Sequence, residues 1–250
     1  MVTSNLKQKL IAVSLSLVMC TTYSLANATK TVREVYQCNL KGDAQISDVI
    51  EASKYWDKQL DKLKITGLNA FMWTPFKTRG TVDFLWFSQY KDINEFGEIS
   101  DLYYNSDEGA SADARFNELA DCRSSALSYL EPVITSDTQL SSPVVISSYA
   151  CVINADHDMQ SVADLNRHIV GTYEGNELYK SLRVSMSTPF VSSSDYDLYY
   201  FSVHDDFSTY SARVTDQQGS ESVAHLNRHI AAVMNCDSSL WRGQRIRIRD

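Results

Sequence analysis

The sequence predicts an α+β protein made of two tandem β-α-β-β-α-β units whose sheets pack against each other. Three observations predict this class: an internal repeat, the same order of strand and helix patterns in each copy, and middle strands that are apolar on both faces. A sheet with two apolar faces needs helices on one face and a second layer on the other.

The internal repeat consists of four matches in nearly the same register. Three of the pairs are separated by 114 residues (188 − 74 for the first) and one pair of cysteines by 113, which favours duplication of an ancestral unit. The matches are 74–76 with 188–190, 83–88 with 197–202, Cys122 with Cys236, and Cys38 with Cys151.

The repeat sets the expected domain boundaries. We predict a first unit at 29–131, a linker at 132–143 and a second unit at 144–250. The linker contains Pro132 and Pro143 within a cluster of Ser, Thr and Asp, a composition typical of connections.

Residues 1–28 are typical of a secretory signal peptide. Two lysines precede a short apolar run, and Ala26-Asn27-Ala28 offers a small-x-small cleavage site. The apolar run is shorter than the roughly 20 residues that a membrane-spanning helix needs. A lipid anchor on Cys20 is the alternative, and the bulky Met19 before it argues against that. We therefore expect a periplasmic or secreted protein with no membrane attachment after cleavage.

The charge of the chain disfavours nucleic acid as a partner. Loss of residues 1–28 removes two lysines and no acid, so the net charge changes from −8 to −10, and an acidic surface repels phosphate. Only the C-terminal end is basic: Arg245, Arg247 and Arg249 alternate with isoleucines, which predicts a strand with one solvated cationic face. A site for an acidic partner is the second interpretation of this strand.

Four cysteines remain after signal cleavage, and in an exported protein we expect them to be oxidised. Four cysteines allow three pairings. The repeat favours Cys38–Cys122 and Cys151–Cys236, because each unit would then keep its own bridge. A zinc site is disfavoured, because no two cysteines have C-x-x-C spacing.

Hydrophobic periodicity gives the elements of the first unit in order. We expect a strand at 34–40, a helix at 47–64, strands at 68–76 and 82–88, a helical region at 92–104 and 111–121 broken near Gly109, and a short strand at 127–133. The second unit repeats the order, with helices near 159–172 and 220–234 and a final strand near 240–248. The Thr-Pro pairs at 74–75 and 188–189 predict strand ends, since proline cannot donate to a strand ladder.

The two middle strands place large apolar residues on both faces. Ala70, Met72 and Phe76 share one face, and Phe71 and Trp73 share the other. The strand at 82–88 does the same, with Phe84 and Trp86 opposite Leu85 and Phe87. The second apolar face must also be shielded from water, most simply by the sheet of the other unit.

This order of elements, with its duplication and sheet pattern, resembles the ferredoxin-like units of the dimeric α+β barrel superfamily. The resemblance implies that the first and last strands of each unit pair antiparallel. It also implies a ligand cavity between each sheet and its helices, lined by some of Trp56, Met72, Trp73, Phe84, Trp86 and Phe96. The alternative is that these side chains form only the core. Members of the superfamily include cofactor-independent monooxygenases, haem-dependent enzymes and proteins with no known reaction.

Other candidate residues have simpler explanations. Asp83 and Asp197 begin apolar strands and could act as bases, but an aspartate there more often caps a turn. Glu221, His225 and His229 share a helix face, and surface histidines explain this better than a metal site. His204 or His168 would be the axial ligand in a haem interpretation, which no attachment motif supports. We expect no metal and no cofactor.

The leading functional hypothesis is a disulfide-stabilised pseudodimer that binds a small apolar or aromatic molecule. The main alternative is a cofactor-independent monooxygenase of the antibiotic-biosynthesis-monooxygenase type, with Trp73, Trp86 or His204 near the substrate. A protein-interaction module that uses the arginine-rich terminal strand is the third. The sequence leaves further association of the pseudodimer open.

Overall fold

The computed structural model describes residues 30–78, 80–140 and 142–248. The predicted signal peptide, with Cys20, lies outside these residues, as does Arg249. The described residues of 30–134 are called the first half below, and those of 144–248 the second half.

Both halves have the order of elements that the sequence predicts. The first contains β1 (Thr31–Leu40), α1 (Ile46–Lys62), β2 (Asn69–Lys77), β3 (Phe84–Tyr90), α2 (Ile93–Tyr104), α3 (Asp107–Leu119) and β4 (Ala120–Ile134). The second contains β5 (Val144–Ile153), α4 (Met159–Tyr173), a short 3₁₀ helix (Glu177–Tyr179), β6 (Arg183–Ser192), β7 (Leu198–His204), α5 (Phe207–Gly219), α6 (Glu221–Val233) and β8 (Met234–Arg247). Strand β4 extends through the first three residues of the predicted linker.

Side-chain caps determine where most helices begin. The side chains of Asp92, Ser106, Asp158, Asp206 and Ser220 each accept a hydrogen bond from a backbone amide in the first turn of the helix that follows. Helix α2 ends at Tyr104, as predicted, and α3 begins at Asp107 rather than at residue 111. No residue range was predicted for helix α5.

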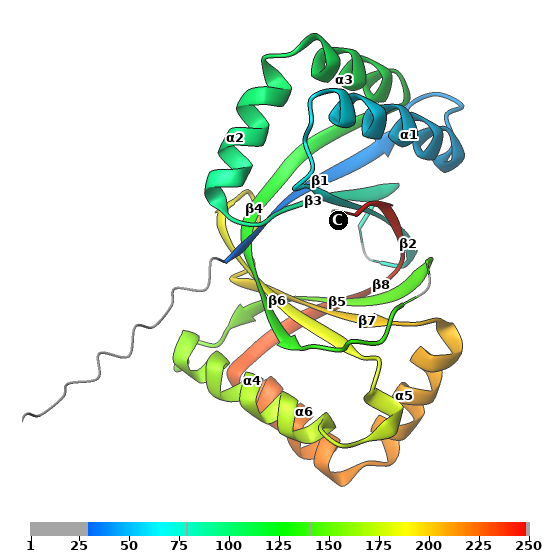
Figure 1. The fold of residues 1–250 in the computed structure, drawn as a ribbon. Coiled ribbons are helices and arrows are strands. Elements are labelled where there is room, and N and C mark those ends of the chain that lie inside the picture. Colours follow the sequence, from blue (N-terminus) through cyan, green and yellow to red (C-terminus); the bar gives the residue numbers. More distant parts are fainter. Residues whose placement is uncertain (1–29, 79, 141, 249–250) are drawn as a thin grey trace, which may run out of the picture.

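The eight strands form a closed antiparallel barrel in the order β1-β3-β2-β8-β5-β7-β6-β4. Within each half, the first and last strands pair antiparallel as predicted. The halves are joined through strand edges, β2 with β8 and β4 with β6, so the sheets form one barrel rather than two separate stacked layers. Figure 1 shows the helices of the two halves on opposite sides of this barrel.

The double role of the last strands explains their length. Residues 120–130 of β4 pair with β1, whereas 126–134 pair with β6 of the other half. Strand β8 likewise pairs with β5 and then with β2. Strands β4 and β8 each pair first with a strand of their own half and then with a strand of the other half. Both are therefore longer than the segments that the sequence predicted.

The prediction that strands end at Pro75 and Pro189 is wrong. Both residues lie inside strands, β2 and β6, and each is next to an irregularity in pairing. A β-bulge allows a residue without an N–H to stay within a strand. In β2 the irregularity turns Phe76 away from the core, so its side chain is half exposed and packs against Phe207.

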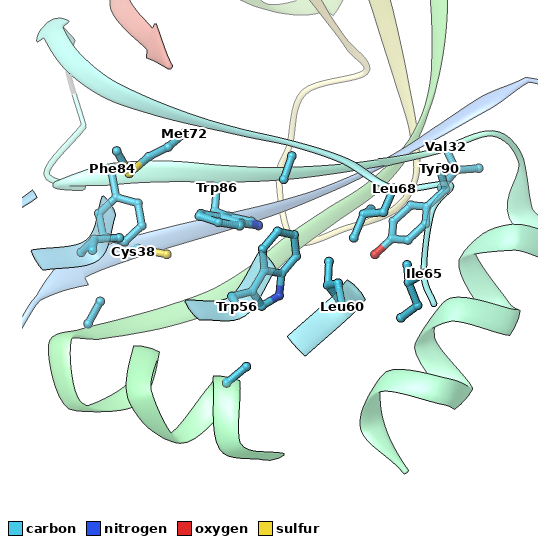
Figure 2. Packing of buried hydrophobic residues seen from close by; sticks show 14 residues of the cluster. Val32, Cys38, Trp56, Leu60, Ile65, Leu68, Met72, Phe84, Trp86 and Tyr90 are labelled. Atoms are coloured by element: carbon cyan, nitrogen blue, oxygen red, sulfur yellow. The ribbon is translucent and has the colours of Figure 1, made fainter. Parts of the chain in front are cut away.

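The two faces of the sheet are buried in different clusters, as the sequence pattern indicated. Met72 and Phe84 belong to the cluster beneath helices of the first half, shown in Figure 2. Trp73 and Phe87 point into the barrel and pack with residues of the other half, including Phe201 and Trp241. The ring centroids of Trp73 and Phe201 are 5.2 Å apart, so side chains of both halves fill part of the interior.

The disulfides have the pairing that the repeat favours. Cys38 is bonded to Cys122 and Cys151 to Cys236. Each bridge connects residues directly opposite each other in the first and last strands of one half. The bridges therefore fix the register of the strand pair that closes each half.

The arginines of β8 do not form one solvated cationic face. Residue 247 pairs with Ala70 and residue 245 with Phe71, which leaves Ile246 as an extra residue in β8. Arg247 consequently reaches α1, where it forms ion pairs with Asp57 and Asp61 and donates to the carbonyl of Ile65 at 2.6 Å. Arg245 is exposed and also lines a cavity inside the barrel. No helix among the described residues is long and apolar enough to cross a membrane.

Candidate functional site

A cavity of about 250 Å³ lies between the sheet and the helices of the first half. Its walls include Trp56 of α1, Trp86 of β3 and Phe116 of α3. The indoles of Trp56 and Trp86 meet edge to face, with ring centroids 5.2 Å apart, and Phe116 contacts Trp86 at 5.3 Å. Figure 2 shows the two indoles facing each other from the helix and the sheet. Such walls fit a small planar ring.

A buried carboxylate and several tyrosines form the first polar group in this cavity. Tyr36 donates to Glu34 at 2.7 Å, Tyr90 donates to it at 3.3 Å, and the hydroxyls of Tyr36 and Tyr104 are 3.2 Å apart. Burial, followed by the nearby charge of Glu34, raises the pKa of Tyr36 and of Tyr90. These hydroxyls therefore stay protonated and hold the Glu34 carboxylate in place.

Asp113 of α3 is the second carboxylate of the cavity. Tyr103 of α2 donates to its Oδ1 at 2.7 Å. Burial raises the pKa of Asp113, against the opposing effect of the Tyr103 hydrogen bond. A half-buried carboxylate with a raised pKa is a better proton acceptor than an ordinary aspartate, and it lies next to apolar walls where a substrate ring could bind.

The second half has a cavity of the same volume, about 250 Å³, in the corresponding place. His204 lines it, with Nδ1 3.1 Å from Nη1 of Arg213 and Nε2 3.3 Å from Oγ of Ser147. Since a guanidinium can only donate, Nδ1 accepts and the proton lies on Nε2. Burial and then the Arg213 charge lower the pKa of His204 to about 4. The ring is thus neutral and held from both sides.

These contacts test the haem interpretation. His204 has both ring nitrogens engaged by protein groups, so neither is free to bind iron. His168 lies between α4 and α6, where its Nδ1 is 3.0 Å from Nδ1 of His229. Since His168 lines neither the two cavities beneath the helices nor the cavity inside the barrel, neither histidine is placed to ligate a haem inside them.

The helix-face histidines and the repeated aspartates occupy sites apart from the cavities. His225 is exposed, and the described residues contain no group of three His, Cys, Asp or Glu side chains placed to hold a metal ion. Asp83 and Asp197 are exposed and bind backbone amides of neighbouring strands. Neither aspartate lines either cavity.

The seven residues predicted to line a ligand pocket are distributed over three spaces. Trp56, Phe84 and Trp86 line the cavity of the first half. Met72 is buried in the cluster beneath it, and Phe96 packs against Tyr90. Trp73 lines the barrel interior, and His204 lines the cavity of the second half. The structure brings three of the seven together.

Glu34, Tyr36, Tyr103 and Asp113 were missed from the sequence. One available signal was the alternation in β1, where Val32, Glu34, Tyr36 and Cys38 share one face. Val32 and Cys38 are fully buried, so a charged residue between them belongs to a buried site. No comparable signal marks Asp113, because its helix is polar on most sides.

No family model and no curated protein sequence matches the chain. Solved structures do match. A "putative monooxygenase" from Fusobacterium nucleatum subsp. nucleatum superposes with a TM-score of 0.61 at 10% identity, over 89% of this chain and 95% of that chain. A "putative monooxygenase" from Lactobacillus acidophilus NCFM gives 0.56 at 9% identity, over 87% and 95%. A "putative chlorite dismutase" gives 0.55 at 13% identity, over 87% and 95%. At such identities the likeness shows a shared fold.

Proposed function

We propose that this chain is an exported protein that binds a small electron-rich aromatic molecule in the cavity of the first half and oxygenates it without a cofactor. The observation that carries the proposal is the combination of aromatic walls with Asp113, a carboxylate whose pKa is raised by burial. The description of two structures of this fold as "putative monooxygenase" agrees with it. The two disulfides support export.

The proposal includes the origin of the two halves as duplicated ferredoxin-like units. Their shared order of elements and equivalent disulfides support this. The offset of 114 residues then pairs Asp113 with Asn227 and Trp86 with Tyr200, and both of these second-half residues line the second cavity. The first cavity thus has a carboxylate where the second has a neutral amide. This difference supports a reaction in the first half only.

A suitable substrate by size is the phenol 1-naphthol. Asp113 accepts the hydroxyl proton, and the naphtholate, which is electron-rich at C4, gives one electron to O₂. The resulting radicals combine at C4, and Asp113 returns the proton to form a C4 hydroperoxide. Loss of water converts this into 1,4-naphthoquinone, so one O₂ yields one quinone and one water. Glu34 and its tyrosines hold the polar side of the cavity, and the indoles orient the ring.

The test is O₂ consumption by the purified protein with 1-naphthol, together with mass analysis of the product formed under ¹⁸O₂. We expect one labelled oxygen in the quinone and one in water. Asp113→Asn should lower kcat/KM by about 10²-fold, a usual effect of losing a general base, with little change in binding. Asn227→Ala, at the matched position of the second half, should leave the rate unchanged.

A second candidate function is binding without reaction, which the aromatic walls of the same cavity favour. Naphthol that binds in a Trp86-dependent manner, with no O₂ consumed above the uncatalysed rate, would support this candidate and reject the oxygenase. Absence of both binding and O₂ consumption would reject both.

A further inference from the structure

A large apolar-lined space lies inside the barrel, on the opposite face of the sheet from Trp86. This cavity has a volume of about 520 Å³, within the range of about 300–1,000 Å³ that is usual for ligand pockets. Phe71, Trp73 and Phe87 line it from the first half, and Ile146 and Val203 from the second. Its walls would suit an apolar or aromatic body.

The charges that line this cavity are all positive among the residues described. Arg33, Arg183 and Arg245 contribute to its wall, and no described lining residue is acidic. The chain as a whole has a net charge of −8. Three arginines therefore line one apolar cavity of an otherwise acidic protein, which favours an anionic ligand.

Arg33 is the most deeply buried of the three, with 5% of its surface exposed. Turned so that its carbonyl oxygen faces Arg33, the Gln89 amide accepts from Nε at 3.1 Å and from Nη2 at 2.7 Å. Nη1 has no hydrogen-bond partner among the described residues, and neither has the buried Nε of Arg183. A buried donor without a partner costs about 1–3 kcal/mol, and more when it is charged.

The surroundings of Arg33 only partly offset this cost. Its guanidinium lies 4.7 Å from the centroid of Phe201 and 5.2 Å from that of Phe87, so ring faces stabilise the charge. Burial still lowers the pKa of Arg33 to about 9. An anion in the cavity would supply both the missing hydrogen-bond acceptor and the missing countercharge.

We propose that the barrel interior binds a small organic carboxylate with an aromatic or apolar body, and that Nη1 of Arg33 donates to the carboxylate. A monoanion is favoured over a phosphate dianion, because Arg33 offers one unpaired nitrogen and the neighbouring walls are apolar. Arg183, with its unpaired Nε, contributes a second donor. The site lies on the other face of the sheet from Asp113, so it does not depend on the proposed oxygenase.

The test compares 2-naphthoate with its neutral analogue 2-naphthamide by calorimetry on the intact protein. We expect naphthoate to bind at least tenfold more tightly, and Arg33→Met to remove this difference while Arg123→Met, at an exposed arginine, keeps it. With ¹⁵N-labelled indoles, naphthoate should shift the NMR signal of Trp73 and leave that of Trp86 in place.

Equal affinity for the two ligands, no binding of naphthoate, or a shift at Trp86 alone would overturn the proposal. Should Arg33→Met fail to fold, Arg183→Met decides the question. We expect it to weaken naphthoate binding at least fivefold and to leave naphthamide binding unchanged; unchanged naphthoate binding would reject the site.

Discussion

Asp83 and Asp197 make the same hydrogen bond in the two halves. Oδ2 of Asp83 accepts from the backbone amide of Leu40 at 2.8 Å, and Oδ2 of Asp197 accepts from that of Ile153 at 2.8 Å. Leu40 and Ile153 each lie two residues after a disulfide cysteine. The aspartates thus bind the end of the first strand of their half to the beginning of β3 or β7, close to the disulfide.

We predict that Asp83→Ala and Asp197→Ala lower stability by equal amounts, about 1 kcal/mol each, because each removes one exposed hydrogen bond. Urea unfolding of the two variants measures this. Asp83→Asn is the control, since its amide oxygen can still accept from Leu40. A loss of oxygenase activity in Asp83→Ala, with its stability unchanged, would contradict the structural role.

The two disulfides should contribute similarly to stability. They close loops of 84 and 85 residues, and in the chain-entropy model each contributes at most about 4–5 kcal/mol. Replacing Cys38 and Cys122 together by alanine, or Cys151 and Cys236 together, should lower the free energy of unfolding by comparable amounts. Peptide mapping without reduction should find only the pairings within each half, and a Cys38–Cys151 peptide would contradict the structure.

The sequence predicted the elements whose apolar pattern is strong, and missed those whose burial depends on partners from other elements. Helix α5 illustrates the limit: the one side chain it buries is Arg213, which bonds His204, Ser181 and the carbonyl of Leu178. A helix anchored by a charged residue has no apolar stripe to detect. The early residues of β4 and β8 were missed for a related reason, because exposed polar residues such as Asp121 and Asn235 interrupt their apolar pattern.

The candidate site was predicted in part for the same physical reason. Trp56 and Trp86 could be identified because large aromatics at regular spacing mark a sheet and a helix that face each other. The contact between Tyr103 and Asp113 joins two helices, and the ring-stacked Arg33 depends on strands from both halves. Neither arrangement follows from the spacing within one element.

His204 should make stability depend on pH. Its pKa is about 4 in the folded protein and about 6.5 when unfolded. The unfolded chain therefore binds the proton more readily, so stability is full above about pH 6.5 and is lost as the pH falls toward 4, by about 3 kcal/mol at most. Urea unfolding between pH 7 and 4 should show a flatter dependence for His204→Gln. His225→Gln, at an exposed histidine, should keep the wild-type slope, and equal slopes for all three proteins would contradict this assignment.

Arg247 should hold helix α1 of the first half to the last strand of the second. Its side chain is only 10% exposed, and besides the ion pairs with Asp57 and Asp61 it donates to the carbonyl of Ile65 at 2.6 Å. Arg247→Met removes these bonds and leaves a carbonyl without its partner, so we expect the free energy of unfolding to fall by about 2 kcal/mol.

A double-mutant cycle with Asp57→Asn should give a coupling energy of about 1 kcal/mol that decreases with salt, whereas the exposed Lys54–Glu51 pair should show almost none. Because the bonds connect the two halves, hydrogen exchange in α1 should also become faster in Arg247→Met. Unchanged exchange together with zero coupling would show that the terminal strand does not stabilise the first half.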